Sequence, residues 1–369
     1  MTDPDESAGR LSRLQAQMAE ARVDLVAIAP TPNMRYLLGF APLADERLCL
    51  LLVTPQDTRL VAPELTADQI QARTGMEAIL RWSDDTGPRQ ALTEAVSALG
   101  AGSGVVLAAD AAMRADALLL LQETIDPQRC VTSEEMMSAL RMCKSEEEIE
   151  ALARAAAQAD RALMVGADAC QPGVTEREVA EKIAHYFRQD GAEAVDVTLV
   201  ASGPNSAFPH HEAGDRRLQV GDTIIIDIVA TLDGYKSDVT RVVHLGEPSP
   251  QVRAVYQVVR EANRHGHEAA VAGAYARDVD RAARAVIEQA GYGPYFVHRT
   301  GHGLGMEVHE APWISAGSTT VLEPGMVFSV EPGIYLEGQF GVRIEDIVVV
   351  TEGECRCLTG LDRALIIKS

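Results

Sequence analysis

The stretch Thr223-Ile-Ile-Ile-Asp227-Ile-Val-Ala230 decides the fold, because it is an apolar run with one carboxylate at its centre. Such a run predicts a strand buried in a sheet. An Asp-Gly dipeptide follows at 233–234, and this pair favours a two-residue hairpin turn. With that turn, Thr240 lies opposite Asp227, so Asp238 falls on the same sheet face as Asp227. The two aspartates are then diagonal neighbours, about 7 Å apart at the backbone.

Two buried carboxylates this close together limit the chemistry of the site. A carboxylate inside an apolar strand is costly to bury unless it is paired or bound to a metal. For Asp227 alone, a salt bridge to a buried arginine is the competing interpretation. Two such groups repel unless a cation lies between them or one takes up a proton. A shared metal ion is the simpler explanation, because short aspartate side chains can converge on it.

Three further candidate ligands follow along the chain. They are His302 in Gly301-His-Gly-Leu-Gly305, Glu331 in Val327-Phe-Ser-Val-Glu331-Pro-Gly333, and Glu345 in Gly341-Val-Arg-Ile-Glu345-Asp-Ile-Val-Val349. A single histidine is more often an ordinary hydrogen-bonded residue than a ligand, but glycines on both sides permit close backbone approach. The glycines do not indicate a phosphate loop, because no strand–loop–helix context surrounds them.

The strand register of the two glutamates is not settled by the sequence. A two-residue turn at Glu337-Gly338 would place Glu331 and Glu345 on opposite faces of a hairpin. We therefore expect a bulge at Pro332-Gly333 if the two carboxylates meet. Four carboxylates and one histidine fit two divalent ions about 3.5–4 Å apart. This oxygen-rich set without thiolate suits manganese, cobalt or iron, with zinc as an alternative.

Composition narrows the class of protein. The chain has 369 residues, enough for about two domains, and 47% of them are hydrophobic. The net charge of −21 carries no basic block, which argues against nucleic acid or an anionic membrane as partner. Residues 1–10 lack a signal-peptide pattern, and no apolar run spans a bilayer. The six scattered cysteines are interpreted as reduced thiols, so we expect a cytoplasmic protein.

The pattern of elements predicts two domains, residues 1–140 and residues 141–369. In the first, helices are expected at 11–22 and 115–123, and strands at 25–29, 48–53 and 105–109. In the second, capping boxes at Ser145/Glu148 and Thr175/Glu178 open two helices. Further helices are expected at 251–272 and 279–290, and strands at 197–201, 223–230, 236–245, 326–330 and 342–350. In the second domain, the order of two helices followed by strands thus occurs twice, which indicates an internal structural duplication.

Taken together, these residues resemble the prolidase and aminopeptidase P family of "pita-bread" dinuclear metallopeptidases. The resemblance rests on Asp227 and Asp238 eleven apart, Gly-His302-Gly, Glu331-Pro-Gly and Arg-Ile-Glu345 in that order. It extends to the segments 33–40, 140–145 and 201–210, and so to nearly the whole chain. It implies an α/β creatinase-like N-terminal domain and an α+β pita-bread C-terminal domain with a curved antiparallel sheet.

The resemblance also implies roles for individual residues. Asp227 and Asp238 would hold one metal ion, and Asp238, His302, Glu331 and Glu345 the other. Glu331, His210 and His309 would be catalytic. His298 and Arg343 would contact the substrate. His211 is the less favoured neighbour of His210.

The activity implied is metal-dependent hydrolysis of the bond between an N-terminal residue and proline in a dipeptide. The nearest alternative is aminopeptidase P, which acts on longer peptides. A metal-free creatinase-like hydrolase, a non-catalytic binding protein on this scaffold and a methionine aminopeptidase are less favoured, the first two because the ligand set is complete. Relatives are commonly homodimers, and the stretch 40–47, with Asp45 and Arg47, is a candidate loop reaching towards a partner's site.

Overall fold

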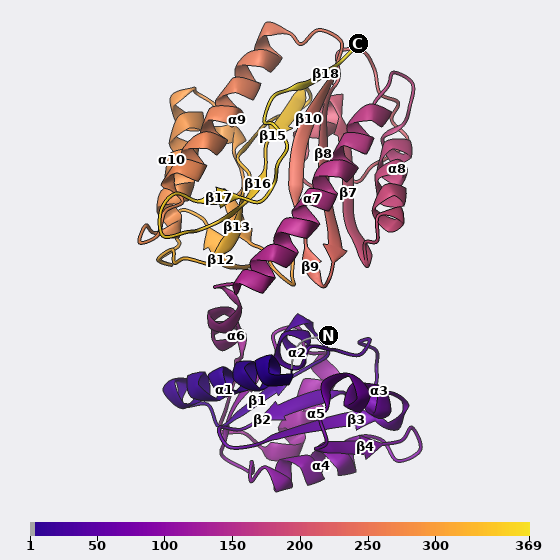
Figure 1. Ribbon diagram of the computed structural model, residues 1–369, viewed down its shortest axis with the longest axis vertical. Helices are drawn as coiled ribbons and strands as arrows, with labels where there is room; N and C mark the ends of the chain where they lie inside the picture. Colours follow the sequence, from indigo (N-terminus) through magenta and orange to yellow (C-terminus); the bar gives the residue numbers. More distant parts are fainter. Residues whose placement is uncertain (1–3) are drawn as a thin grey trace. The chain divides into compact units, whose positions relative to one another are not determined.

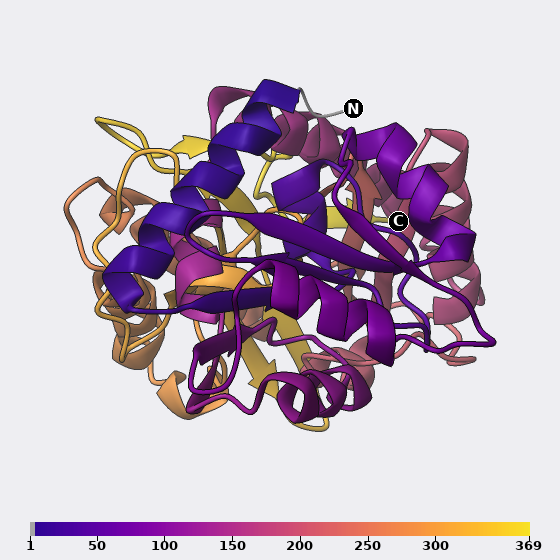
Figure 2. The ribbon, with the colours of Figure 1, turned by 90° about the horizontal axis from the view of Figure 1, so that it is seen from below.

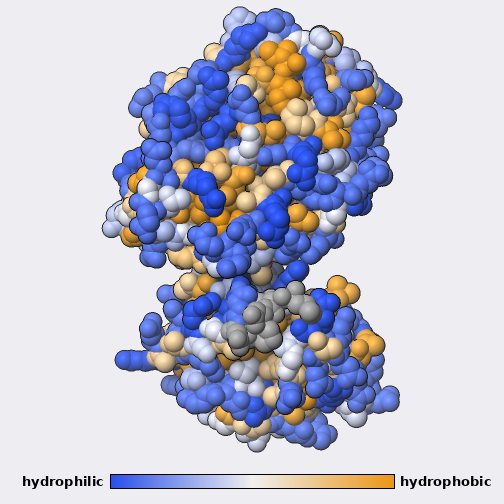
Figure 3. Space-filling view, in the orientation of Figure 1, coloured by the Kyte–Doolittle hydropathy of each residue, from blue (hydrophilic) through white to orange (hydrophobic). Residues whose placement is uncertain are grey.

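The computed structural model describes residues 4–369, so the first three residues of the acidic N-terminal stretch lie outside the described part. The chain divides into two compact units, the first ending at Arg141 and the second beginning at Met142. Hydrophilic residues cover most of the face shown in Figure 3, and hydrophobic patches interrupt them. Within residues 4–369, no helix combines the length and the apolar character needed to span a bilayer.

A six-stranded mixed sheet organises the first unit, in the order β4-β3-β2-β1-β5-β6. Helices α4 and α5 cover one face of it, where Leu92 and Leu121 share a core with Leu50 and Leu107. Figure 2 shows α1 on the other side of the sheet. The expected α/β character is confirmed, although α1 begins at Pro4 rather than at residue 11, because polar turns precede its apolar stripe. The elements are α1 Pro4–Ala21, β1 Leu25–Ile28, α2 Pro32–Leu38, β2 Leu50–Val53, β3 Thr58–Pro63, α3 Glu64–Thr74, β4 Ile79–Trp82, α4 Arg89–Ala98, β5 Val106–Ala109, α5 Ala115–Ile125, β6 Arg129–Thr132 and α6 Glu134–Arg141.

The first half of the second unit places two helices on a five-stranded sheet of order β18-β10-β8-β7, with β9 paired to β8. Both expected capping boxes are confirmed at the starts of α7 and α8, at Ser145/Glu148 and Thr175/Glu178. The elements, labelled in Figure 1, are α7 Glu146–Ala169, α8 Glu176–Gln189, β7 Ala194–Ser202, η1 Gly203–Ala207, β8 Thr223–Leu232, β9 Tyr235–Lys236, β10 Val239–Leu245 and β18 Ile366–Lys368.

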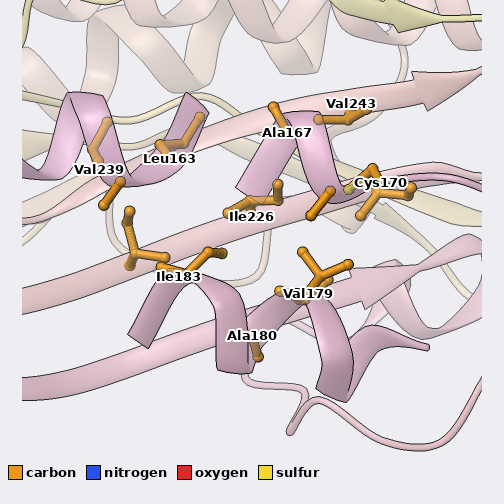
Figure 4. Close-up of a cluster of buried hydrophobic side chains, with 14 of the residues drawn as sticks. Leu163, Ala167, Cys170, Val179, Ala180, Ile183, Ile226, Val239 and Val243 are labelled. Atoms are coloured by element: carbon orange, nitrogen blue, oxygen red, sulfur yellow. The ribbon is translucent and has the colours of Figure 1, made fainter. Parts of the chain in front are cut away.

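Strand β8 is buried on both faces, which explains its continuous apolar sequence. Ile226 packs with Leu163 of α7 and Ile183 of α8 in the core seen in Figure 4. Ile225, one residue earlier, belongs to the core on the opposite face. Because strand side chains alternate between faces, Asp227 points to the side of Ile225. That side carries the functional site.

The hairpin after β8 follows the register expected from its Asp-Gly turn. Asp233 and Gly234 both have positive φ, 52° and 82°, as the favoured two-residue turn requires. Leu232 pairs with Tyr235, and Thr240 pairs with Asp227. The single strand expected at 236–245 is interrupted, however, so that Asp238 lies between β9 and β10.

The second half of the unit combines two helices with a five-stranded sheet of order β12-β11-β13-β16-β17 and the hairpin β14-β15. The strands of this sheet and of the hairpin pair antiparallel throughout. The expected strand 342–350 is divided at Glu345, which instead bridges to Thr240 of the first half. The elements are α9 Pro250–Ala269, α10 Ala276–Gln289, η2 Gly293–Tyr295, β11 Gly301–Gly303, β12 Glu310–Ile314, β13 Val327–Val330, β14 Gly333–Leu336, β15 Phe340–Arg343, β16 Asp346–Val349 and β17 Arg356–Cys357.

The prediction of a bulge at Pro332-Gly333 is wrong. Gly333 pairs with Arg343, and Val330 pairs with Asp346. Val330 lies three residues before Gly333, and Asp346 lies three residues after Arg343, so the register is unchanged between the two pairs. Counting one residue from the second pair brings Glu331 opposite Glu345. The extra residue lies in the turn instead, because Leu336 pairs with Phe340 and leaves a three-residue loop. Gly338 in that loop has a left-handed φ of 73°.

The two halves repeat the same local connections. Each contains a helix pair joined by a short turn, α7–α8 and α9–α10. The turn of the first pair donates a hydrogen bond from the Gly173 N–H to the Leu218 carbonyl, and the turn of the second from Gly273 to Leu322. Both bonds measure 2.8 Å and tie each helix pair to the segment that precedes a central strand. The internal duplication expected from the order of elements is therefore present in the backbone.

The turn at Gly338 offers a test of how the two glutamates are aligned. A Cβ at this position would meet no atom within 4 Å, so Gly338→Ala costs only the left-handed backbone conformation. We expect it to lower the free energy of unfolding by about 1 kcal/mol. Gly353→Ala is the matched control, since its surroundings are equally open and its φ is not left-handed. Urea unfolding of both variants is the measurement, and equal stability of the two would contradict the turn.

Candidate metal centre and active site

The five predicted ligands line one cavity of about 950 Å³ in the second unit. His210, His298, His309 and Arg343 line it too, so the structure brings together every site residue that the sequence indicated. The donors come from separate elements. Asp227 lies in β8, Asp238 follows β9, His302 lies in β11, and Glu331 and Glu345 follow β13 and β15.

Asp238, His302 and Glu345 form the tightest group. One potential ligand atom from each lies within 4.8 Å of the others, and all three side chains are buried. Glycines on both sides of His302 make this possible. A Cβ at Gly301 would stand 1.8 Å from the Ser329 carbonyl oxygen, and one at Gly303 would stand 2.1 Å from that of Ala311. The close approach expected from the glycines is therefore confirmed.

The buried carboxylates carry charge that the protein alone does not balance. Burial and the negative charge of Glu345 raise the pKa of Asp238 well above its usual range. Burial and the charge of Glu331 do the same to the pKa of Glu345. Thr240 donates a hydrogen bond to Glu345 Oε2 at 2.7 Å, which opposes this shift in part. Carboxylates in this condition accept a proton or a cation.

Glu331 is balanced differently, because it faces His302. Its Oε1 lies 3.3 Å from His302 Nε2, and the Ser329 hydroxyl donates to the same oxygen at 3.2 Å. Burial raises the pKa of Glu331, but the hydrogen bond and charge of His302 outweigh it and lower the pKa to about 2. Glu331 is therefore ionised at neutral pH and can receive a proton.

The orientation of His302 favours a cation at its second nitrogen. Nδ1 lies 3.1 Å from the Gly303 carbonyl, which can only accept, so Nδ1 carries the hydrogen. Nε2 then points towards Glu331 and Asp238, at 3.3 and 3.8 Å. When Nε2 carries a proton, the ring is the cation that lowers the pKa of Glu331, and when it does not, its lone pair faces the carboxylates. Lone pair and carboxylates repel unless a proton or metal ion lies between them. The donor set thus fits a divalent metal ion held by Asp238, His302, Glu331 and Glu345.

Asp227 stands apart from this group because Arg343 binds it. The Arg343 guanidinium donates to Asp227 Oδ2 and lies 3.3 Å from the Thr240 hydroxyl. The Arg343 guanidinium therefore supplies a positive charge beside Asp227. The salt bridge weighed for Asp227 from the sequence is thus present, and the metal ligation by Asp227 stays a prediction.

A chain of hydrogen bonds joins the two predicted substrate-contact residues. Arg343 donates to the Tyr335 hydroxyl at 2.7 Å, and Tyr335 lies 2.8 Å from His298 Nε2. His298 Nδ1 lies 2.7 Å from the Arg299 carbonyl, so Nδ1 carries the hydrogen and Nε2 accepts from Tyr335. Burial lowers the pKa of His298, which agrees with a neutral ring. Tyr335 was not indicated by the sequence reasoning, although it shares the strand face of Glu331 and Gly333.

His309 and His210 are placed at the more open part of the cavity. The His309 ring stands edge-on to that of His302, with centroids 4.3 Å apart. Partial burial and the charge of His302 lower the pKa of His309 to about 4, so it is a neutral hydrogen-bond donor at pH 7. His210 is exposed. Its neighbour His211 contacts buried Glu176 at 2.8 Å through Nε2, which gives this less favoured histidine a structural contact.

Comparison with known proteins identifies the family. Residues 150–352 match metallopeptidase family M24, and residues 10–143 match the creatinase/prolidase N-terminal domain. The probable dipeptidase PepE of Mycobacterium tuberculosis is 39% identical, over 99% of this chain and 97% of that protein. A prolidase structure from Thermococcus sibiricus has a TM-score of 0.93 and 36% identity, covering 100% of both chains. An X-Pro aminopeptidase structure from Thermotoga maritima has a TM-score of 0.84 and 33% identity, covering 97% and 99%.

These matches agree with the fold and family expected from the ligand motifs. The chain therefore belongs to metallopeptidase family M24, with a creatinase/prolidase N-terminal domain followed by the pita-bread metallopeptidase domain.

Proposed function

We propose that the chain hydrolyses the bond between an N-terminal residue and proline in dipeptides, as an Xaa-Pro dipeptidase that depends on divalent metal ions. The observation that carries this is the buried group of Asp238, His302 and Glu345 with Glu331 beside it, at one cavity. Relatives over the full length of the chain include a prolidase and a probable dipeptidase, which supports the substrate class.

The proposed metal site holds two ions. Asp227 and Asp238 would hold one, and Asp238, His302, Glu331 and Glu345 the other, with Asp238 and Glu345 shared. Oxygen-rich ligation favours manganese or cobalt, with zinc or iron as alternatives. Such ions, when bound, supply Lewis-acid polarisation and an activated water molecule.

The chain's own residues supply the proton transfers and the orientation. Glu331 lines the cavity beside His302, and we assign it to take the proton of the attacking water. His309 is neutral and can donate a hydrogen bond to the carbonyl oxygen of the scissile amide as charge develops there. His210 and His298 line the same cavity and are proposed to contact the substrate. Arg343 is proposed to orient the site through Tyr335 and Asp227.

Action on longer peptides is the second candidate, because the X-Pro aminopeptidase of Thermotoga maritima shares the fold over 97% of this chain. A metal-free reaction is disfavoured, since the donor set is complete. We also propose a homodimer in the cytoplasm whose substrates are proline-containing di- or oligopeptides, with the stretch 40–47 near a partner's site. Within the first unit, Arg47 forms salt bridges with Asp45, Glu46 and Asp84.

A panel of peptides tests the function. Purified protein with added Mn²⁺ is assayed on Ala-Pro, Ala-Pro-Ala and Ala-Ala, with each product quantified. We expect Ala-Pro to be cleaved fastest. Faster cleavage of Ala-Pro-Ala would transfer the assignment to an aminopeptidase, and cleavage of Ala-Ala alone would remove the preference for proline.

The base assignment predicts the behaviour of Glu331→Gln. The amide is nearly isosteric but cannot take up a proton, so kcat on Ala-Pro should fall by about 10²–10⁴-fold. Glu181→Gln is the control, because Glu181 is an exposed carboxylate of the same cavity without a role in the proposed chemistry. Metal content is measured in both variants. Near wild-type turnover in metal-loaded Glu331→Gln would refute the assignment.

Metal removal should destabilise the protein. Because Asp238 and Glu345 are buried beside like charge, a bound cation relieves a repulsion that the unfolded chain does not have. With Mn²⁺ at 100 times its dissociation constant, we expect about 2.7 kcal/mol of added stability over chelator-treated protein. Thermal unfolding with and without the metal is the measurement. Asp238→Asn should lose most of this gain and Glu181→Gln should keep it, whereas equal gains in both would contradict the site.

A further inference from the structure

Asn263 is a fully buried amide on α9 whose donors reach the backbone on both sides of the glutamate pair. Its Nδ2 lies 2.8 Å from the Val330 carbonyl oxygen and 3.3 Å from that of Ile344. Carbonyls only accept, so the nitrogen of the amide faces them and donates one hydrogen to each. Val330 directly precedes Glu331, and Ile344 directly precedes Glu345. One side chain therefore joins the two segments just before both candidate ligands.

A proline explains why a side chain is needed at this point. The Ile344 N–H donates to the Pro332 carbonyl oxygen at 3.5 Å. Residues paired in this way in an antiparallel ladder normally exchange two bonds, and the second would run from the N–H of residue 332 to the Ile344 carbonyl. Proline has no N–H to give. Nδ2 of Asn263 supplies that donor, so the side chain replaces a backbone hydrogen bond.

The first half of the unit has an apolar residue at the matching place. A Cβ at Gly166 of α7 would stand 3.5 Å from the side chain of Ile226 in β8. A Cβ at Gly266 of α9 would stand 2.7 Å from the side chain of Val330 in β13. Three residues before these glycines lie Leu163 and Asn263. The leucine packs with Ile226 in the core seen in Figure 4. Strand β8 contains no proline, so its ladder needs no side-chain donor.

Pairing of polar groups alone does not account for the amide. In the described part of the chain, Oδ1 of Asn263 meets no hydrogen-bond donor. A leucine here would leave the Ile344 carbonyl without its side-chain donor, whereas Asn263 leaves its own oxygen unpaired. Each choice buries an unsatisfied acceptor, which is unfavourable. What the amide adds is a fixed backbone beside the two glutamates.

We propose that Asn263 is a positioning residue that holds Glu331 and Glu345 at the separation a divalent metal ion requires. This rests on the proposed metal-dependent hydrolysis and adds a residue that sets metal affinity through the backbone. The two carboxylates carry like charge and repel before a cation binds. The bonds from Nδ2 hold their strands together against that repulsion.

Titration of metal-free protein with Mn²⁺, followed by calorimetry, tests the proposal. Asn263→Leu copies the residue of the first half and removes both donors. We expect the Kd for Mn²⁺ to rise by about tenfold to hundredfold, as for other residues that orient ligands from outside. Asn263→Ala removes the same donors with a smaller side chain and should act likewise, so it decides the matter if the leucine variant does not fold.

Gln158→Leu is the matched control. Gln158 is a buried amide on α7 whose Nε2 donates to the Asp190 carbonyl at 2.7 Å and whose Oε1 also meets no donor in the described residues. Its partner lies at the end of α8, which carries none of the ligands. Gln158→Leu should lower the thermal stability of chelator-treated protein, as Asn263→Leu does, and leave the Kd for Mn²⁺ unchanged.

A second substitution tests the replacement of the proline N–H. Pro332→Ala in the Asn263→Leu background gives residue 332 a backbone donor for the Ile344 carbonyl, so the double variant should regain part of the Mn²⁺ affinity. A double variant that binds no better than Asn263→Leu would contradict this replacement. An unchanged Kd in the Asn263 variants, or an equal loss in Gln158→Leu, would overturn the inference. If wild type binds no Mn²⁺, the proposed metal site fails instead.

Discussion

Repulsion among buried carboxylates is the constraint on which the second unit depends. Asp238 and Glu345 lie in a group of ligand atoms within 4.8 Å, beside Glu331 and Asp227, at the junction of the two halves of the unit. The strand structure is interrupted at Asp238, between β9 and β10, and at Glu345, between β15 and β16, and both side chains line the cavity. Arg343 and His302 balance part of the charge. The remainder fits divalent cations, which explains why this arrangement occurs in a metallopeptidase.

The residues around this centre fix its protonation states. Backbone carbonyls accept from Nδ1 of both His298 and His302, and so turn Nε2 of each ring towards the cavity side groups. Tyr335 then links His298 to Arg343, and through it to Asp227. We infer that Asp227, a candidate metal ligand, and His298 are positioned together.

The duplication of the unit explains how distant segments supply one site. Each half contributes a helix pair and a central strand, and the two halves meet where Glu345 bridges to Thr240. The first half supplies the aspartates and the second supplies His302 and the glutamates.

The sequence by itself determined which candidate ligands gather at the cavity, the register of the β8 hairpin, and the starts of α7 and α8, because apolar runs with a central carboxylate, Asp-Gly turns and capping boxes are local signals. The expected bulge was wrong because the length of a loop containing glycine is not encoded by a two-residue signal, and Gly338 sits in a three-residue turn. Only the tertiary structure decided that Arg343 binds Asp227 and that Tyr335 joins it to His298. These depend on which long side chains reach each other across separate strands, and no local pattern specifies that.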